Sequence, residues 1–314
     1  TQLCVEPGQV AENGLAQRLW RVRAGRVILA TGSIERPMAF ADNDRPGIML
    51  SQAVRTYIRR FGVVPGQRAI IATNNDDAYD TADALIAAGA DVVAVLDARE
   101  TASPRAAHAQ AAGIAVYLGA VPEAAKGGRH GVTGLVASVA GTPQSWAADL
   151  IAVSGGFTPV VHLHQQAGGT LNWVEEAQAF VPGSARQNVT TIGGAAKPGP
   201  VGVMRPISSP KKSFIDFQND VTLADVDLAW AEGYRSVEHL KRYTTLGMAT
   251  DQGKLGNMAA LGRLAEQQGV SIPEAGLTTF RPPYTPVSMG LIAGPGAPHG
   301  GAHIRRLALY DLHA

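Results

Sequence analysis

Residues 68–97 read RAIIATNNDDAYDTADALIAAGADVVAVLD, and this stretch decides the fold. RAIIAT is a short apolar run of the kind found in buried strands. DDAYDTADALIAAG predicts a helix, because its acidic first turn suits the positive end of a helix dipole and Gly89 can end it. DVVAVLD predicts a second buried strand. A strand, a helix and a strand in this order form a βαβ unit, so the sequence predicts a parallel sheet.

The residues before this unit predict two short strands and one amphipathic helix. Residues 18–31 first alternate in polarity and then become apolar, which favours two strands, and a loop rich in Gly, Pro and Asp follows. For residues 51–61 we expect a helix with Ser51 as its N-cap and Gly62 at its end. Its apolar stripe would consist of Val54, Ile58 and Phe61.

The residues after the βαβ unit continue the α/β pattern and then change character. Residues 106–119 predict a further helix and strand, and residues 150–156, LIAVSGG, predict another buried strand. Residues 119–149 indicate an irregular β or loop excursion. Residues 183–212 are rich in Pro, Gly and Ser, which is typical of a linker. Residues 214–269 are typical of a helical region.

Capping residues divide that helical region into separate helices. Thr222 and Ser236 are expected to be N-caps, and Gly233 is expected to end the first helix. Apolar residues at helical spacing predict the core face of the last helix. These residues are Leu255, Met258, Leu261 and Leu264.

The composition excludes several classes of protein. The net charge is +1 and aromatic residues make up 6% of the chain, so neither nucleic acid nor an anionic membrane is an expected partner. Cys4 is the only cysteine, which excludes a disulfide framework and a zinc or iron–sulfur site built from cysteines. No apolar run approaches the roughly 20 residues of a membrane span. We expect a cytoplasmic protein.

The turn of the βαβ unit lacks the features of a dinucleotide site. Such a site needs glycines between strand and helix, so that the backbone can approach the pyrophosphate. Residues 73–79, TNNDDAY, contain none, and Asp76 and Asp77 place negative charge where a phosphate would lie. Asp97 does stand at the end of the second strand, where a ribose-binding acid belongs. The favoured interpretation is a Rossmann-like unit without a nucleotide.

Two other segments combine small residues with a strand end. Residues 27–33, VILATGS, end a strand in Ala30, Thr31 and Gly32, over which a cofactor can pass closely. Residues 191–196, TIGGAA, form a turn whose backbone N–H groups can face an anion. The alternatives are an ordinary buried strand end and a plain turn. The candidate residues of this second segment are Gly193, Gly194 and Ala195.

The histidines do not indicate a metal site. His162 and His164 alternate as on a strand, and His299 and His303 lie in HGGAH. No neighbouring groups would supply the supporting contacts that metal-binding histidines need. The motifs GxSxG and HExxH are also missing from the sequence, which gives no support for a hydrolase.

Three long blocks, the third together with a short later segment, carry a resemblance to a known family. They are residues 26–79, which begin RVILATGSIERPMAF, residues 150–169, LIAVSGGFTPVVHLHQQAGG, residues 214–254, which begin FIDFQNDVTLADVDLAWAEG, and residues 278–287, TTFRPPYTPV. Together they resemble the alpha subunit of heterotetrameric sarcosine oxidase, with opine oxidase and hydrogen cyanide synthase components as relatives. The resemblance covers most of residues 18–292.

This resemblance implies a fold and a domain organisation. The fold class is α/β, a partial Rossmann-like flavoprotein fold with two dinucleotide-binding domains, followed by a small helical domain. We expect the sequence to be truncated at both ends relative to the family, without the glycine-rich fingerprint and the folate-binding domain, and the helix after Ala196 to be disturbed. The expected parts are a remnant of the first nucleotide-binding domain (1–40 and 150–196), the inserted second domain (41–149), a linker (197–213), the helical domain (214–292) and a tail (293–314).

The resemblance also implies cofactors and partners. In such a complex NAD binds the first nucleotide-binding domain of the alpha subunit, and the amine is oxidised at FAD on a beta-type flavin subunit. Electrons pass to FMN near the interface of the two subunits, and small subunits complete the heteromer. Arg242, Lys254 and Arg281 lie among turns rich in Thr and Gly and are candidate donors to the FMN phosphate. The alternative is that they are ordinary solvated cations.

One comparison within the family concerns an iron–sulfur cluster. Residues 215–256 resemble a small helical domain that holds a two-iron two-sulfur cluster in opine- and cyanide-forming relatives. The positions of the four thiolates are Asp216, Gln218, Asp251 and Gly256, and none of these replaces a cysteine thiolate. We therefore expect no iron–sulfur cluster.

Two functions remain open. The first is an oxidoreductase subunit of a sarcosine oxidase-like complex that oxidises a secondary amine such as N-methylglycine. The chain would serve nucleotide binding and the subunit interface, because the sequence contains no residue that we assign as catalytic. The alternative is a non-catalytic interaction protein, or a vestigial one, that binds no cofactor.

Overall fold

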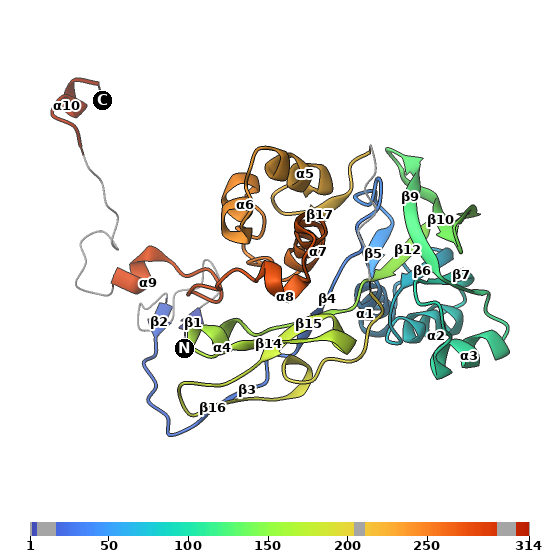
Figure 1. Cartoon of the computed structure of the whole chain (residues 1–314), viewed down its shortest axis with the longest axis horizontal. Coiled ribbons are helices and arrows are strands. Elements are labelled where there is room, and N and C mark those ends of the chain that lie inside the picture. Colours follow the sequence, from blue (N-terminus) through green and yellow to red (C-terminus); the bar gives the residue numbers. More distant parts are fainter. Residues whose placement is uncertain (1, 5–16, 204–210, 294–305, 314) are drawn as a thin grey trace. The chain divides into compact units, whose positions relative to one another are not determined.

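The computed structural model describes residues 2–4, 17–203, 211–293 and 306–313 (Figure 1). The chain divides into two compact units. The larger comprises residues 28–280, and the smaller comprises the described residues within 1–27 and 281–314. The larger unit contains the predicted parallel sheet and most of the predicted helical domain.

A five-stranded parallel sheet is the centre of the larger unit. Its strand order is β5-β12-β6-β7-β8, and every neighbouring pair is parallel. The predicted βαβ unit is therefore confirmed. The strands are β5 (Ile48–Leu50), β6 (Arg68–Thr73), β7 (Asp91–Asp97), β8 (Val116–Leu118) and β12 (Leu150–Ser154), and the connecting helices are α1 (Ser51–Phe61), α2 (Tyr79–Ala87) and α3 (Pro104–Ala111).

Alternation along the strands gives the sheet two apolar faces. Ala69 and Ile71 of β6 pack with residues of α1, α2 and α3 in one core cluster. Ile70 and Ala72 point to the opposite face, where they join a second cluster with Leu135. Because both faces are covered, the strands are continuous apolar runs rather than half-polar ones.

The second face is covered by a sheet that the sequence did not resolve. The predicted irregular excursion is an antiparallel sheet of β9 (Ala120–Gly128), β10 (Gly131–Val139) and β11 (Thr142–Ala147). Small residues dominate these strands, so their alternation is weak in the sequence. Leu135 and Ala137 of β10 are fully buried against the parallel sheet, and this packing sets the orientation of the excursion.

Helix α1 differs from the prediction in its N-cap and in its apolar stripe. Its N-cap is Leu50 and not Ser51, which is the first helical residue and hydrogen-bonds through Oγ to Thr81 Oγ1 at 2.6 Å. The stripe is also shorter than expected, because Phe61 is 59% exposed while Val54 is buried. Gly62 does end the helix, in the left-handed conformation that favours glycine.

Strand β12 is the second strand of the parallel sheet, between β5 and β6. Residues 150–154, which we grouped with the first nucleotide-binding domain, thus share a sheet with strands of the 41–149 region. The domain boundaries themselves stay a prediction.

Short paired segments flank this sheet in the larger unit. β4 pairs with β13, β14 pairs with β15, and β3 pairs with β16. The predicted strand at His162 and His164 is wrong, because both residues lie in helix α4 and are buried. The segments are β3 (Val27–Leu29), β4 (Ser33–Glu35), β13 (Phe157–Pro159), α4 (His162–Gln166), β14 (Leu171–Val174), η1 (Glu175–Ala177), β15 (Ala179–Pro182), β16 (Val189–Thr191) and η2 (Gly193–Ala195).

The helical domain follows the predicted caps. Thr222 and Asp225 form a capping box at α5, and the hydroxyl of Ser236 accepts the N–H of His239 at the start of α6. Gly233 follows α5 with a positive φ. Leu261 and Leu264 of α7 are buried in the domain. The elements are β17 (Phe214–Asp216), β18 (Val221–Thr222), α5 (Leu223–Ala231), α6 (Val237–Thr244), α7 (Asn257–Gln268) and α8 (Ile272–Ala275).

The smaller unit contains few elements. β1 (Gln2–Cys4) pairs antiparallel with β2 (Gln17–Leu19), and two short helices follow, α9 (Met289–Ala293) and α10 (Tyr310–His313). Much of the predicted linker and tail, including His299 and His303, lies outside the described residues. Within the ranges that the structure describes, no helix is both long and apolar enough to span a bilayer.

Candidate functional site

Two segments of small residues that the sequence marked separately lie side by side. Residues 30–32 follow β3, and residues 193–195 follow β16, the strand that pairs with β3. The N–H of Ile192 donates to the carbonyl oxygen of Leu29 at 2.9 Å and so joins the two strand ends. The structure thus brings both sets of candidate residues together, namely Ala30, Thr31, Gly32, Gly193, Gly194 and Ala195.

Gly194 lies close to the facing segment. A Cβ atom at this position would lie 3.1 Å from Ser33 Oγ and 3.8 Å from the carbonyl carbon of Gly32. The facing segment is held in place from its other side. The Thr31 hydroxyl donates to the carbonyl oxygen of Val160 at 2.7 Å, and the Val160 N–H donates to Gly32 at 3.0 Å. The pair of segments therefore has a fixed geometry and leaves little room for a side chain at Gly194.

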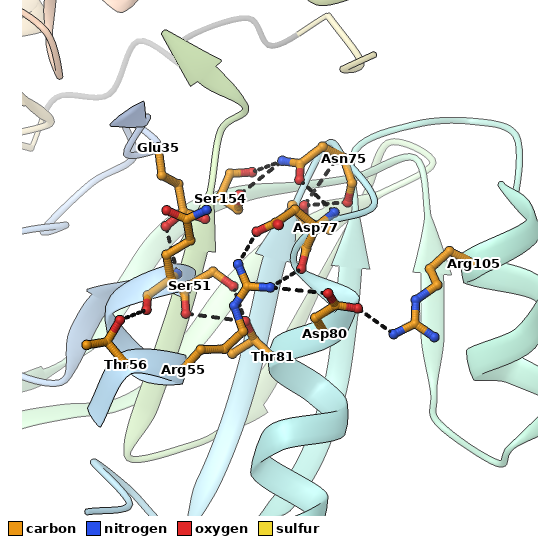
Figure 2. A network of polar contacts seen from close by, with 12 residues as sticks. Glu35, Ser51, Arg55, Thr56, Asn75, Asp77, Asp80, Thr81, Arg105 and Ser154 are labelled. Carbon is orange, nitrogen blue, oxygen red and sulfur yellow. Dashed lines mark hydrogen bonds and ion pairs between the residues drawn. The ribbon is translucent and has the colours of Figure 1, made fainter. Parts of the chain in front are cut away.

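Side chains of the turn of the βαβ unit pair with side chains of neighbouring elements (Figure 2). Arg55 of α1 reaches across to Asp77, with which it forms an ion pair, and its Nη1 lies 3.4 Å from Asp80 Oδ2. The Asn75 amide donates to the carbonyl and hydroxyl oxygens of Ser154 at 3.1 and 3.0 Å. On the other side of Asp80, Arg105 Nη2 lies 2.7 Å from Oδ1. The negative charge of the turn is thus compensated within the chain.

Asp97, the candidate ribose-binding acid, is also engaged. It is fully buried and accepts hydrogen bonds from the Tyr79 hydroxyl at 2.8 Å and from Arg99 Nη2 at 2.6 Å. Arg99 Nη2 lies 2.7 Å from Asp76 as well. Gly202 crosses the turn, and its N–H donates to Asn74 at 2.7 Å. The polar groups of this turn are thus paired within the chain, which favours the interpretation of a Rossmann-like unit without a nucleotide.

Glu35 is a buried titratable residue that the sequence did not single out. It ends β4, is 3% exposed, and accepts the N–H of Gln52 in the first turn of α1 at 2.8 Å. Burial raises the pKa of Glu35 to about 7, and the Ser154 hydroxyl and the Gln52 N–H offset this only in part. Its position in the loop-like GSIERP segment gave no periodic signal from which burial could be predicted.

The three cations proposed to meet a flavin phosphate differ in their exposure and in their contacts. Arg242 is exposed on α6 and pairs with Glu238 at 3.1 Å. Lys254 is 7% exposed and donates to the carbonyl oxygen of Asp251 at 2.9 Å, and burial lowers its pKa. Arg281 is exposed and is the first residue of the C-terminal part of the smaller unit.

The positions that correspond to cluster thiolates do come together. Asp216 accepts the N–H of Gly247 at 2.8 Å, and Gln218 Oε1 accepts the N–H of Asp251 at 3.3 Å. Gly256 has no space for a side chain, because a Cβ atom would lie 2.3 Å from the carbonyl oxygen of Ile215. At three of these positions side-chain oxygens accept backbone N–H groups of neighbouring loops, so these side chains stabilise the loops.

His162 and His164, which the sequence singled out, both make contacts that stabilise the fold. His162 stacks on Phe280, with ring centroids 3.5 Å apart, and burial lowers its pKa to about 4. His164 Nε2 lies 3.1 Å from the carbonyl oxygen of Thr170. Over the residues that the structure describes, no group of three or more His, Cys, Asp or Glu side chains is arranged to hold a metal ion.

The comparisons with known proteins fit this arrangement. Residues 210–295 match the sarcosine oxidase A3 domain, which covers the helical domain. The sarcosine oxidase alpha subunit of Rhizobium meliloti (strain 1021) is 41% identical, over 94% of this chain and 33% of the relative. The chain is homologous to part of a sarcosine oxidase alpha subunit. It spans about one third of the length of the sarcosine oxidase relatives it matches.

Two more distant similarities agree with this homology. An opine oxidase subunit of the same organism is 20% identical, over 87% of this chain and 77% of the relative. The crystal structure of L-proline dehydrogenase from P. horikoshii has a TM-score of 0.67 at 19% identity, over 86% of this chain and 58% of that one. At this identity the structure shows the fold alone. The predicted fold class, α/β and Rossmann-like with a small helical domain, is confirmed.

Proposed function

We propose that this chain is the part of a sarcosine oxidase-like alpha subunit that contributes cofactor-binding loops and a subunit interface to the oxidation of a secondary amine such as N-methylglycine. The observation that carries the proposal is the 41% identity with a sarcosine oxidase alpha subunit over 94% of the chain. The chain would hold cofactor and partner in position, since flavin chemistry resides in the cofactor and the protein supplies binding and orientation.

The paired segments 30–32 and 193–195 are the proposed NAD contact. Their residues fit such a group, because they are small and lie at the ends of two paired strands. Gly193 has a φ of 69° and opens a short turn whose first N–H groups have no partner within that turn. A phosphate or ribose could approach the exposed backbone of Gly193, where an added Cβ would meet nothing within 4 Å. When bound, NAD would supply hydride chemistry or serve as a structural ligand.

FMN shared with a beta-type flavin subunit is the second proposed cofactor. Arg242 is the best placed donor, because it is exposed and its partner Glu238 lies on the same helix. Lys254 fits less well, since its amino group is already directed at the carbonyl oxygen of Asp251. Arg281 is exposed and remains a proposed donor from the smaller unit.

A second candidate function is an interaction protein that binds no cofactor. The observation that favours it is the turn of the βαβ unit, where Arg55, Arg99 and Arg105 pair with the chain's own carboxylates. A domain that has exchanged its nucleotide site for internal ion pairs can still present a surface to a partner.

A titration with NAD separates the two functions. We expect the chain to bind NAD and the variant Gly194→Val to bind it at least tenfold more weakly, because the new side chain would crowd Ser33. The matched control is Gly128→Val, at a strand position where an added Cβ meets nothing within 4 Å. Equal affinities for both variants, or no binding by the wild-type chain, would overturn the proposed NAD contact.

A further inference from the structure

Arg36 is a buried arginine without a carboxylate partner. It follows β4, is 7% exposed, and takes part in no ion pair among the described residues. Its Nη1 donates to the carbonyl oxygen of Gln178 at 2.9 Å, while its buried Nε has no hydrogen-bond partner. A buried guanidinium is normally paired and fully hydrogen-bonded, because removing a charge from water is unfavourable.

The backbone around Arg36 is shaped to hold the guanidinium in place. The Arg36 N–H donates to Gly156, and the Gly155 N–H donates back to Arg36, both at 2.8 Å. Gly156 has a φ of 92°, and a Cβ atom there would lie 2.6 Å from Arg36 Nη2. Gln178, which accepts from Nη1, is itself in the left-handed conformation with a φ of 46°. Two unusual backbone positions thus surround one side chain.

Arg36 lines a cavity between the residues that follow β4, β6 and β12 and helix α7. The cavity volume is about 50 Å³, which is room for a few waters or a small anion but not for a dinucleotide. Arg36 is the only charged residue among those that line it. The opposite wall is apolar and includes Leu255, Met258 and Ala259.

We propose that this cavity binds a small monocarboxylate, which pairs with the guanidinium of Arg36 and whose aliphatic part lies against α7. A planar carboxylate matches the fork of a guanidinium in a bidentate pair. A phosphate dianion fits less well, since the lining offers a single positive charge to compensate it. The site lies apart from segments 30–32 and 193–195, so the inference goes beyond the proposed function.

The pKa of Arg36 agrees with this assignment. Burial lowers it to about 10, and no neighbouring carboxylate counteracts the shift. The side chain therefore remains protonated at neutral pH. A bound carboxylate would supply the missing negative charge.

Thermal unfolding in sodium acetate tests the proposal, with sodium chloride at equal ionic strength as the reference. A ligand that binds only the folded state raises Tm in proportion to the logarithm of its concentration. We expect acetate to raise the Tm of the wild-type chain, and Arg36→Met to weaken acetate binding at least tenfold. The matched control is Arg59→Met, which removes an exposed arginine and should leave the acetate response unchanged.

A second variant keeps the test decisive if Arg36→Met fails to fold. Ala259→Leu retains Arg36 and fills the cavity from α7, so it should also abolish the acetate response. Sarcosine replaces acetate in a parallel series: a response to acetate alone identifies a simple acid, and a response to both identifies an amino-acid carboxylate. An acetate response that is absent, or equal in wild type, Arg36→Met and Ala259→Leu, would overturn the proposal.

Discussion

Replacing Glu35 by Gln is expected to stabilise the protein at alkaline pH. The carboxyl group is 3% exposed, and its pKa is raised from 4.5 to about 7. The folded state therefore holds a proton that the unfolded state releases above pH 4.5. Since the unfolded state binds fewer protons, stability falls as the pH rises through this window, and the loss is complete above the folded pKa.

The magnitude follows from the size of the shift. One pKa unit corresponds to about 1.4 kcal/mol. A rise of about 2.5 units in the pKa therefore means that ionising Glu35 lowers the free energy of unfolding by about 3 kcal/mol above pH 7. Glutamine carries no charge, and its carbonyl oxygen can still accept the N–H of Gln52. We expect Glu35→Gln to match the wild-type protein near pH 4.5 and to exceed its stability by about 3 kcal/mol at pH 8.

Urea denaturation at a series of pH values measures this difference. The unfolding free energies of the two proteins should diverge between pH 4.5 and 7 and then run parallel. The control Glu100→Gln changes an exposed carboxylate and should stay within about 0.5 kcal/mol of the wild type throughout. A constant difference between Glu35→Gln and wild type across the pH range would refute the reasoning.

Three other substitutions have definite expected outcomes. The wild-type protein should lose up to about 3 kcal/mol of stability as the pH falls from 6.5 to 4, because His162 has a pKa of about 4 in the folded state and is protonated first in the unfolded state. His162→Gln should not show this loss when both proteins are unfolded in urea. Gly156→Ala should lower Tm, because Gly156 has a φ of 92° and an added Cβ would lie 2.6 Å from Arg36 Nη2. An unchanged Tm would argue against this backbone conformation at Gly156. Asp97→Asn should destabilise by about 3 kcal/mol in urea, because Arg99 would lose its buried partner, and a loss below about 1 kcal/mol would show that solvent screens this pair.

The parallel sheet could be predicted because its signals are local. Residues 68–97 contain apolar strands and a helix with its own acidic start and glycine end, and no distant contact is needed to recognise them. The caps at Thr222 and Ser236 were predictable for the same reason, since each interacts with a residue three positions later. Ser51 was misassigned because Thr81, 30 residues away, takes its hydroxyl group.

The buried charges could not be predicted, because long-range contacts determine them. Glu35 is buried by its contact with α1, and Arg36 by the Gly155–Gly156 segment and by Gln178. Neither residue lies in a periodic segment. The adjacency of residues 30–32 and 193–195 likewise depends on the pairing of β3 with β16, which are separated by the whole parallel sheet in sequence. From the sequence, only the small residues of the two segments could be recognised, and not their adjacency.

The central claim, that the chain works as part of a sarcosine oxidase-like alpha subunit, is tested most directly by native mass spectrometry. The chain would be co-expressed with a beta-type flavin subunit encoded in the same genome and purified through a tag on the chain. The account predicts a complex that contains both chains and bound flavin. Recovery of the chain alone, without partner or flavin, would contradict it.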